Sequence, residues 1–308
     1  MKKILIVGAG NIGYWYFIAL QKIKKIRIKI YILEVSEKNL TKFKKKINCD
    51  KKIFFLKNVR NLPKKIDLAI ISTTSKNRLL TVKKIINATM VKNFILEKII
   101  EQSLKNLNNF LKLSKKFNFF ISFPQRCSKF NQYLSKTKKI KNLKIEVLST
   151  SDDIMSNSIH FLDLFSWISG LELKKIDTTK LHNWHESKRK FFFEAYGTIN
   201  FFFKKNFCLK IKGNPKQKKG YKKITINKKK FNIFNFYEKI KIKKKVITSN
   251  SLAISNVMNI EIEKILNKRT SYLPKFQTIF NNHYKYIENL LEHFNKEKKT
   301  NIKNLPIT

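Results

Sequence analysis

Two parts of this 308-residue chain carry side chains that could move a proton. Lys98 lies just past the apolar run Phe94–Leu96, and a lysine in a partly apolar cleft near other cations has a lowered pKa and can shuttle a proton. His160 and Asp163 lie about one helical turn apart in an apolar segment, so their side chains share a face. Such a pair is either a satisfied pair in the core or part of a site that faces a crevice. The sequence leaves both open.

The beginning of the chain has the spacing of a nucleotide-binding turn. The apolar run Ile4–Val7 predicts a buried strand, and a glycine-rich turn and an apolar helix follow it. The residues of this turn are Gly8, Gly10, Asn11, Ile12 and Gly13. In a G-x-G-x-x-G turn the first glycine allows a sharp bend, the second lets backbone approach a pyrophosphate, and the third lets the helix pack closely, with its N–H groups toward the anion. Because only 7 residues are glycine, we favour a dinucleotide site over a glycine-rich turn without a ligand.

One acidic residue indicates which dinucleotide binds. Glu34 ends the second apolar run and lies 21 residues after Gly13. An acid near that distance accepts hydrogen bonds from the adenosine ribose and repels a 2′-phosphate. The sequence therefore favours NAD over NADP, and the alternative is an ordinary exposed acid at a strand end.

Strand-like and helix-like segments alternate as far as residue 122. They predict a Rossmann domain, an α/β domain with a doubly wound parallel sheet, over residues 1–122. The predicted strands are Ile4–Val7, Arg27–Leu33, Ile53–Leu56, Asp67–Ser72, Phe94–Leu96 and Phe119–Phe123. Ligands bind beyond the carboxyl ends of such strands. Besides the glycine turn, the residues expected at that edge are Glu34, Thr73, Thr74, Glu97, Lys98, Gln125 and Arg126.

Residues 123–308 differ in pattern and predict an α+β domain. Aromatic-rich strands joined by short turns indicate a mostly antiparallel sheet. The predicted strands are Leu143–Leu148, Leu171–Ile176, Phe191–Phe203, Phe207–Ile211, Ile224–Ile226, Phe231–Tyr237 and Ile240–Ile247. The predicted helices are Ser156–Ile168, Ser255–Leu266 and Phe276–Asn295, and we expect the tail from Lys296 to fray.

The formal net charge of +47 invites a nucleic-acid function, but the pattern does not favour one. The lysines are spread along the chain, and the aromatic residues lie in strand-like runs. We expect a solvated cationic surface with raised affinity for phosphorylated substrates. Only six basic residues are arginines, and Arg126 and Arg189 are candidates to contact substrate anions. Lys188 belongs to the same basic segment as Arg189, and the alternative for this segment is a basic turn.

The remaining composition points to a cytoplasmic protein. No apolar run is long enough to span a membrane, and no secretory signal is visible. Cys49, Cys127 and Cys208 are odd in number and widely spaced, which fits a reducing compartment. Because no histidines cluster with carboxylates at ligand spacing, we expect no metal.

Together these residues resemble the Gfo/Idh/MocA family of sugar-type oxidoreductases. The features that carry the resemblance are, in chain order, the Gly8–Gly13 turn, Asp67–Ser72 with Thr73 and Thr74, the strand ending in Glu97 and Lys98, and Ile159–Leu164 in a helix that ends in glycine. The resemblance implies a Rossmann domain followed by a domain whose large sheet often forms a dimer or tetramer interface. It also implies hydride transfer between NAD(H) or NADP(H) and a carbon that bears oxygen, usually on a sugar or cyclitol.

The resemblance assigns roles to several residues. Lys98 matches the family lysine, His160 matches the family histidine, and Asp163 would orient His160 or bind a hydroxyl. Two positions depart from the family: Ile99 stands where proline is usual, and Ser156 where many members have aspartate. Asn157 and the segment with Lys188 and Arg189 resemble a branch from surface-polysaccharide gene clusters, which makes them candidate substrate contacts.

We therefore expect an NAD-dependent oxidoreductase acting on a sugar or nucleotide sugar. One alternative uses tightly held NAD for transient oxidation, giving epimerisation or elimination. The other is a nucleotide- or polyanion-binding protein without turnover.

Overall fold

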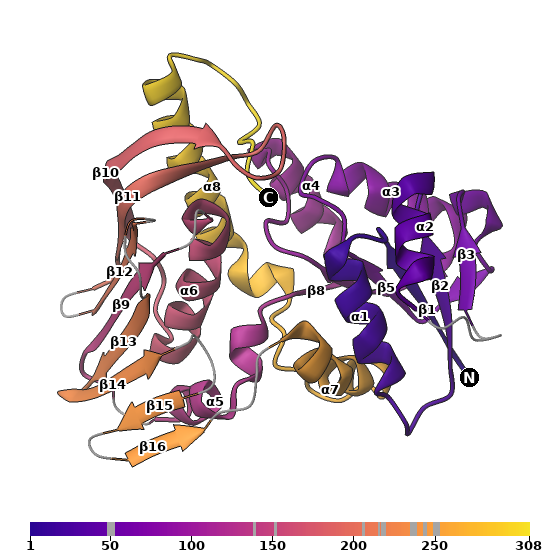
Figure 1. The fold of residues 1–308 in the computed structure, drawn as a ribbon, viewed down its shortest axis with the longest axis horizontal. Helices are drawn as coiled ribbons and strands as arrows, with labels where there is room; N and C mark the ends of the chain where they lie inside the picture. The colour runs from indigo at the N-terminus through magenta and orange to yellow at the C-terminus, as the bar shows by residue number, and fades with distance from the viewer. Residues whose placement is uncertain are drawn as a thin grey trace. The chain divides into compact units, whose positions relative to one another are not determined.

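The computed structural model (Figure 1) describes residues 1–47, 53–137, 140–150, 153–204, 207–214, 216, 220–234, 239–242, 245–248 and 253–308. The chain forms two compact units. The first unit comprises Met1–Glu101, Lys105–Pro124 and Ala253–Thr278, and the second comprises Gln102–Leu104, Gln125–Leu252 and Ile279–Thr308. Residues 253–278 thus belong to the first unit, although they follow most of the second unit in the sequence. The predicted division into residues 1–122 and 123–308 does not include this segment in the first domain.

The first unit contains a six-stranded parallel sheet, so the predicted doubly wound sheet is confirmed. Its strands, in the order β3-β2-β1-β5-β7-β8, are β3 (Ile53–Leu56), β2 (Ile28–Leu33), β1 (Lys2–Val7), β5 (Leu68–Ile71), β7 (Asn93–Leu96) and β8 (Asn118–Ile121). The apolar runs are strands because they are buried on both faces, as in β5, where all four residues are buried. The strand order reverses between β1 and β5, and ligands bind beyond the carboxyl ends of strands at such a point.

Helices connect these strands, and one later helix joins them. The helices are α1 (Asn11–Gln21), α2 (Glu37–Lys45), α3 (Arg78–Ala88), α4 (Leu104–Leu113) and α7 (Ile254–Leu266). Short pieces complete the unit: the paired strands β4 (Lys65–Ile66) and β6 (Met90–Val91), and the 3-10 turn η1 (Val59–Asn61). Helix α7 packs against α1, where Lys22 Nζ donates to Asn256 Oδ1 at 2.6 Å (Figure 1).

The second unit contains an eight-stranded sheet in which only the β12–β9 pair of the described ladders is parallel, so the predicted mostly antiparallel sheet is confirmed. Its strands, in the order across the sheet, are β10 (Lys175–Glu186), β11 (Phe193–Phe202), β12 (Phe207–Gly213), β9 (Leu143–Ser149), β13 (Tyr221–Ile226), β14 (Lys229–Phe234), β15 (Lys239–Ile242) and β16 (Lys245–Thr248). Helix α6 (Ile154–Ser169) packs on β9, β11 and β12, and helix α8 (Phe276–Lys298) contacts α6 and β11 (Figure 1). The 3-10 turn η2 (Pro124–Cys127) and helix α5 (Lys129–Ser135) precede the sheet.

Several predicted elements differ from the structure. The expected strand Leu171–Ile176 is wrong, because the strand there begins only at Lys175 and runs to Glu186. As the edge strand it buries only three of its side chains, Ile176, Leu181 and Trp184, so it lacks the apolar pattern that predicts a strand. The run Ile240–Ile247 forms two strands rather than one. Residues 235–237 of the run predicted to end at Tyr237, and Cys49, lie outside the described residues.

The chain end is ordered, which corrects the expectation of a frayed tail. Helix α8 continues to Lys298, and the residues after it pack on the second unit. Leu305 and Ile307 are fully buried, and Leu305 N donates to the Gln102 carbonyl at 3.0 Å. Burial of two apolar side chains gives this segment the stabilisation that a polar tail would lack.

Candidate active site

The glycine turn leaves space beside the first turn of α1. Gly8 has φ +96°, and a Cβ there would lie 3.3 Å from the Ser72 and Thr73 backbone. A Cβ on Gly13 would lie 2.0 Å from the Gly8 carbonyl oxygen, whereas a Cβ on Gly10 would meet nothing within 4 Å. Gly8 and Gly13 thus serve close packing, and Gly10 borders open space. Because Gly10 caps α1 without a side chain and Asn11 and Ile12 begin the helix, its first N–H groups are available to an anion.

Glu34 is buried beside this turn rather than exposed at a strand end. It is 9% exposed, its Oε2 accepts from Ala9 N and its Oε1 from Ser36 N, each at 2.8 Å. The carboxylate therefore ties the glycine turn to the start of α2. Each oxygen has a second lone pair that could accept a ribose hydroxyl.

Two threonines follow β5 at the same edge of the sheet. Thr74 is exposed, whereas the Thr73 hydroxyl is buried and has no hydrogen-bond partner among the described residues. A buried hydroxyl without a partner is costly unless a ligand or water satisfies it. The open space at Gly10, the available N–H groups and this hydroxyl all fit a dinucleotide.

Glu97 and Lys98 follow β7. Glu97 is 7% exposed and accepts from the Tyr16 hydroxyl at 2.9 Å, and Tyr16 also lies 2.8 Å from Ser122 Oγ. The carboxylate predicted to bind cofactor is therefore engaged by a side chain of α1. Lys98 is half-buried, and its peptide bond to Ile99 is cis.

The loop that carries Lys98 is held by Arg78, a residue that the sequence analysis did not assign. Arg78 is 1% exposed, and its guanidinium donates to the Thr73 and Glu97 carbonyls, each at 2.5 Å. It also donates to the Ile99 carbonyl and, at 3.1 Å, to that of Ile100. Arg78 thus joins the segment after β5 to the segment after β7. Its membership of a set of only six arginines was the signal that could have drawn attention to it.

The charge of Arg78 is compensated inside the first unit. Burial lowers its pKa to about 10, and the nearby carboxylates of Glu97 and Glu101 act in the opposite direction. Glu101 also accepts from Leu79 N at 2.9 Å, at the start of α3. Arg78 is therefore charged at neutral pH, and its guanidinium remains a hydrogen-bond donor there.

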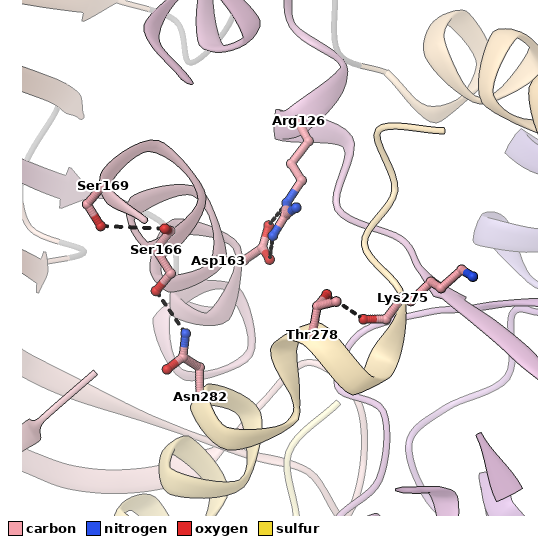
Figure 2. Close-up of polar contacts among 7 residues, drawn as sticks. All are labelled: Arg126, Asp163, Ser166, Ser169, Lys275, Thr278 and Asn282. Atoms are coloured by element: carbon pink, nitrogen blue, oxygen red, sulfur yellow. Dashed lines mark hydrogen bonds and ion pairs between the residues drawn. The ribbon is translucent and has the colours of Figure 1, made fainter. Parts of the chain in front are cut away.

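In the second unit the structure pairs two residues that we predicted separately. Arg126 Nε and Nη2 donate to the two carboxylate oxygens of Asp163 at 2.8 and 2.6 Å (Figure 2). The Arg126 guanidinium also lies over the Trp167 ring, 5.2 Å from its centroid. Burial raises the pKa of Asp163, and Arg126 acts against that rise. Arg126 was expected to contact a substrate anion, and Asp163 to orient His160 or bind a hydroxyl, but here the two charged groups bind each other.

Helix α6 carries the other predicted residues. Asn157 and His160 are both half-buried and lie on successive turns of one face. Gly170, with φ +66°, ends the helix as predicted. Asn282 of α8 donates to Ser166 Oγ at 2.8 Å (Figure 2), which fixes the far end of α6. Both residues therefore lie on a helix that is anchored near its C-terminus.

Lys188 and Arg189 lie in the turn between β10 and β11, and both are exposed. Arg189 N donates to Ser187 Oγ at 3.1 Å, which shapes the turn locally. Within the part of the chain that the structure describes, no three His, Cys, Asp or Glu side chains gather as metal ligands. No described helix is both long and apolar enough to cross a membrane.

Solved structures with the same arrangement come from oxidoreductases. No protein-family model and no curated protein matches the sequence. Scyllo-inositol dehydrogenase from Lactobacillus casei with NAD(H) and scyllo-inositol has a TM-score of 0.67 and 17% identity, covering 96% of this chain and 97% of that one. UDP-N-acetylglucosamine 3-dehydrogenase from Acidithiobacillus ferrooxidans has 0.68 and 13%, covering 94% and 96%. An Agrobacterium radiobacter oxidoreductase in complex with NAD⁺, L-tartaric acid and magnesium has 0.69 and 12%, covering 93% and 94%.

The chain has the fold of these oxidoreductases. Within that fold the predicted site residues divide between the units. Those in the first unit are Gly8, Gly10, Asn11, Ile12, Gly13, Glu34, Thr73, Thr74, Glu97 and Lys98, and those in the second are Arg126, Asn157, His160, Asp163, Lys188 and Arg189.

Proposed function

We propose that the protein is an NAD-dependent oxidoreductase that acts on a hydroxyl- or keto-bearing carbon of a sugar or nucleotide sugar. The observation that carries the proposal is the glycine turn, with open space at Gly10 and the Glu34 carboxylate 2.8 Å from Ala9 N. Two proteins of the same fold support it, one solved with NAD(H) and scyllo-inositol and one a UDP-N-acetylglucosamine 3-dehydrogenase. The proposal places the protein in the cytoplasm, in surface-polysaccharide biosynthesis, as a homodimer or homotetramer through its C-terminal sheet.

The residues of the first unit have distinct roles in this proposal. The N-terminus of α1 and Gly10 hold the pyrophosphate, Glu34 accepts from the adenosine ribose and disfavours a 2′-phosphate, and Thr73 and Thr74 flank the nicotinamide half. Bound nicotinamide supplies hydride acceptance or donation.

Proton transfer is the task of this chain's own side chains. Alcohol oxidation releases a proton from the hydroxyl, and Lys98 Nζ takes it, aided by His160. Arg78 holds the backbone on both sides of Lys98, so the amine projects from a fixed loop. Asn157, Lys188 and Arg189 bind the substrate, the last two through phosphate groups of a nucleotide sugar.

Titration of NADH, followed by its fluorescence, tests the proposal. Wild-type protein should bind NADH more tightly than NADPH, and absence of binding at tens of micromolar would overturn the proposal. Gly10→Ala is the matched variant, because its new methyl group meets no protein atom within 4 Å and Gly10 has an ordinary φ of −77°. This variant should have the same free energy of unfolding as the wild type. Its affinity for NADH should be at least about tenfold lower, which corresponds to a loss of about 1.4 kcal/mol of binding free energy. Unchanged affinity would show that the nucleotide does not lie on this turn.

A further inference from the structure

Helix α6 begins without a cap from its own sequence neighbours. The residue before the helix, Asp153, makes no side-chain capping hydrogen bond. An N-cap side chain normally accepts from the N–H of the second or third helical residue, here Met155 or Ser156. Without such an acceptor the first N–H groups of a helix have no partner within it.

Glu194 of strand β11 supplies the acceptor from elsewhere in the second unit. Its side chain is buried, with the residue 4% exposed, and its Oε2 accepts from Met155 N at 2.6 Å. Ser156 N donates to the same carboxylate, 3.2 Å from Oε1. The Met155 carbonyl in turn accepts from the Tyr286 hydroxyl of α8. The first turn of α6 is thus held by a strand on one side and by a helix on the other.

The carboxylate of Glu194 lies against the backbone of Ser156, one turn before His160. Position 156 itself is a serine, and the carboxylate that accepts from the backbone of this turn comes from strand β11. Burial raises the pKa of Glu194 to about 7, the hydrogen bonds from Ser156 and Met155 act against that rise, and Asp153 adds to it. Glu194 and Tyr286 also interact electrostatically, and burial keeps the pKa of Tyr286 well above its usual value. Among the described residues, the groups that face Glu194 are therefore Asp153, Ser156 and Tyr286, and none of these three carries a positive charge.

A buried charge without a cation is expensive, whereas a neutral amide of the same shape would be less so. An ionised carboxylate is, however, about twice as strong an acceptor as a neutral group. An ionised Glu194 therefore lowers the free energy of unfolding relative to a neutral amide, but it accepts more strongly from the N–H groups of the helix.

We infer that Glu194 is a positioning residue for His160: its ionised carboxylate fixes the first turn of α6, and protonation loosens that turn. The catalytic role of His160 in this inference rests on the proposed function. The hold on the helix does not, because it is a property of the apo protein.

Amide hydrogen exchange measured by mass spectrometry across a pH series tests the inference. The hydrogen bonds from Met155 and Ser156 lower the pKa of Glu194, so a local opening that breaks them while the carboxylate stays buried is disfavoured when Glu194 is ionised. After correction for intrinsic exchange rates, the wild-type amides of Met155 and Ser156 should therefore become several-fold more protected as pH rises from about 6 to about 8, through the pKa of Glu194. Glu194→Gln should abolish this rise and exchange at a constant, faster rate. Protection that is independent of pH in the wild type, or equal in Glu194→Gln, would overturn the inference.

Glu297→Gln is the matched control in the same unit. Glu297 accepts from Trp184 N at 2.8 Å, so this variant should lose protection at Trp184 and keep the wild-type pH dependence at Met155 and Ser156. NMR of the five histidine rings adds a direct readout of positioning. Glu194→Gln should shift the His160 resonance, identified by its loss in His160→Asn, and an unmoved resonance would contradict the inference.

The NADH titration keeps the two proposals apart. Glu194 belongs to the second unit and the nucleotide residues to the first, so Glu194→Gln should bind NADH within about twofold of the wild type. If no variant binds NADH, the proposed function fails while the exchange result still decides the role of Glu194.

Discussion

The loop after β7 and the first turn of α6 are built on the same plan with opposite charges. In the first, the buried guanidinium of Arg78 donates to carbonyls around Lys98, and in the second, the buried carboxylate of Glu194 accepts from N–H groups one turn before His160. Arg78 has two carboxylates near it and a pKa of about 10, whereas the pKa of Glu194 is about 7. The comparison teaches that the two predicted catalytic residues are held differently. Lys98 lies on a loop held by Arg78, which is charged at neutral pH, whereas His160 lies on a helix held by Glu194, whose charge changes near neutral pH.

The largest effect should come from removing the permanent charge. Arg78→Met leaves four carbonyls without their donor and Glu97 and Glu101 without a buried counter-charge, which should lower the free energy of unfolding by about 3–5 kcal/mol. Urea unfolding at pH 7 measures this loss. Arg78→Lys keeps the positive charge but lacks the planar guanidinium, so its free energy of unfolding should lie between those of Arg78→Met and the wild type. Equal stability of Arg78→Met and the wild type would mean that the guanidinium does not hold this loop.

Removing the residue that Arg78 positions should affect turnover instead of stability. Lys98→Ala should bind NADH nearly as well as the wild type and lose about 10²- to 10⁴-fold in turnover, because only proton transfer is removed. Steady-state NADH production with a sugar alcohol that the wild type oxidises provides the measurement. Turnover at the wild-type rate would take Lys98 out of the mechanism.

The switchable anchor should reveal itself in the pH dependence of stability. The pKa of Glu194 is about 7 in the folded protein against an ordinary 4.5, so the folded state binds the extra proton between these values and stability falls as pH rises through that range. The shift corresponds to about 3 kcal/mol. The free energy of unfolding of the wild type relative to Glu194→Gln should therefore decrease by about that amount from below pH 4.5 to above pH 7. If the free energy of unfolding depends on pH in the same way in the wild type and in Glu194→Gln, then the charge of Glu194 does not change near neutral pH and the contrast with Arg78 is wrong.

The smallest effect should come from a second carboxylate that caps a helix. Glu101 accepts from Leu79 N at the start of α3, much as Glu194 does at α6. Glu101→Gln keeps a neutral acceptor, so we expect a loss of only about 1 kcal/mol in urea unfolding. A loss as large as that of Arg78→Met would show that Glu101 serves mainly as the counter-charge of Arg78.

What could be predicted from the sequence follows from local physics. The apolar runs of the first unit predict buried parallel strands, and the strand ends correctly brought Gly8, Glu34 and Thr73 to one edge of a sheet. Most of edge strand β10 was not predicted because it buries few side chains. Helix α5 was not predicted because it is too short to show a clear helical repeat of apolar residues.

The anchors themselves could not be predicted, because each depends on contacts between distant residues. Arg78 reaches a loop about twenty residues away, and Glu194 lies in an aromatic run that indicates core rather than a helix cap. Arg126 and Asp163 were both singled out, but their 37-residue separation gave no sign that they would bind each other.

The packing of α7 on α1 has a consequence for how the protein is made. Lys22 and Asn256 are 234 residues apart, yet they meet on neighbouring helices of the first unit. During synthesis the face of α1 that α7 covers stays open until residues 254–266 have left the ribosome, and closing so long a loop costs entropy. The first unit is therefore completed only after residues 125–252 of the second unit have been synthesised, and until then α1 lacks its partner helix.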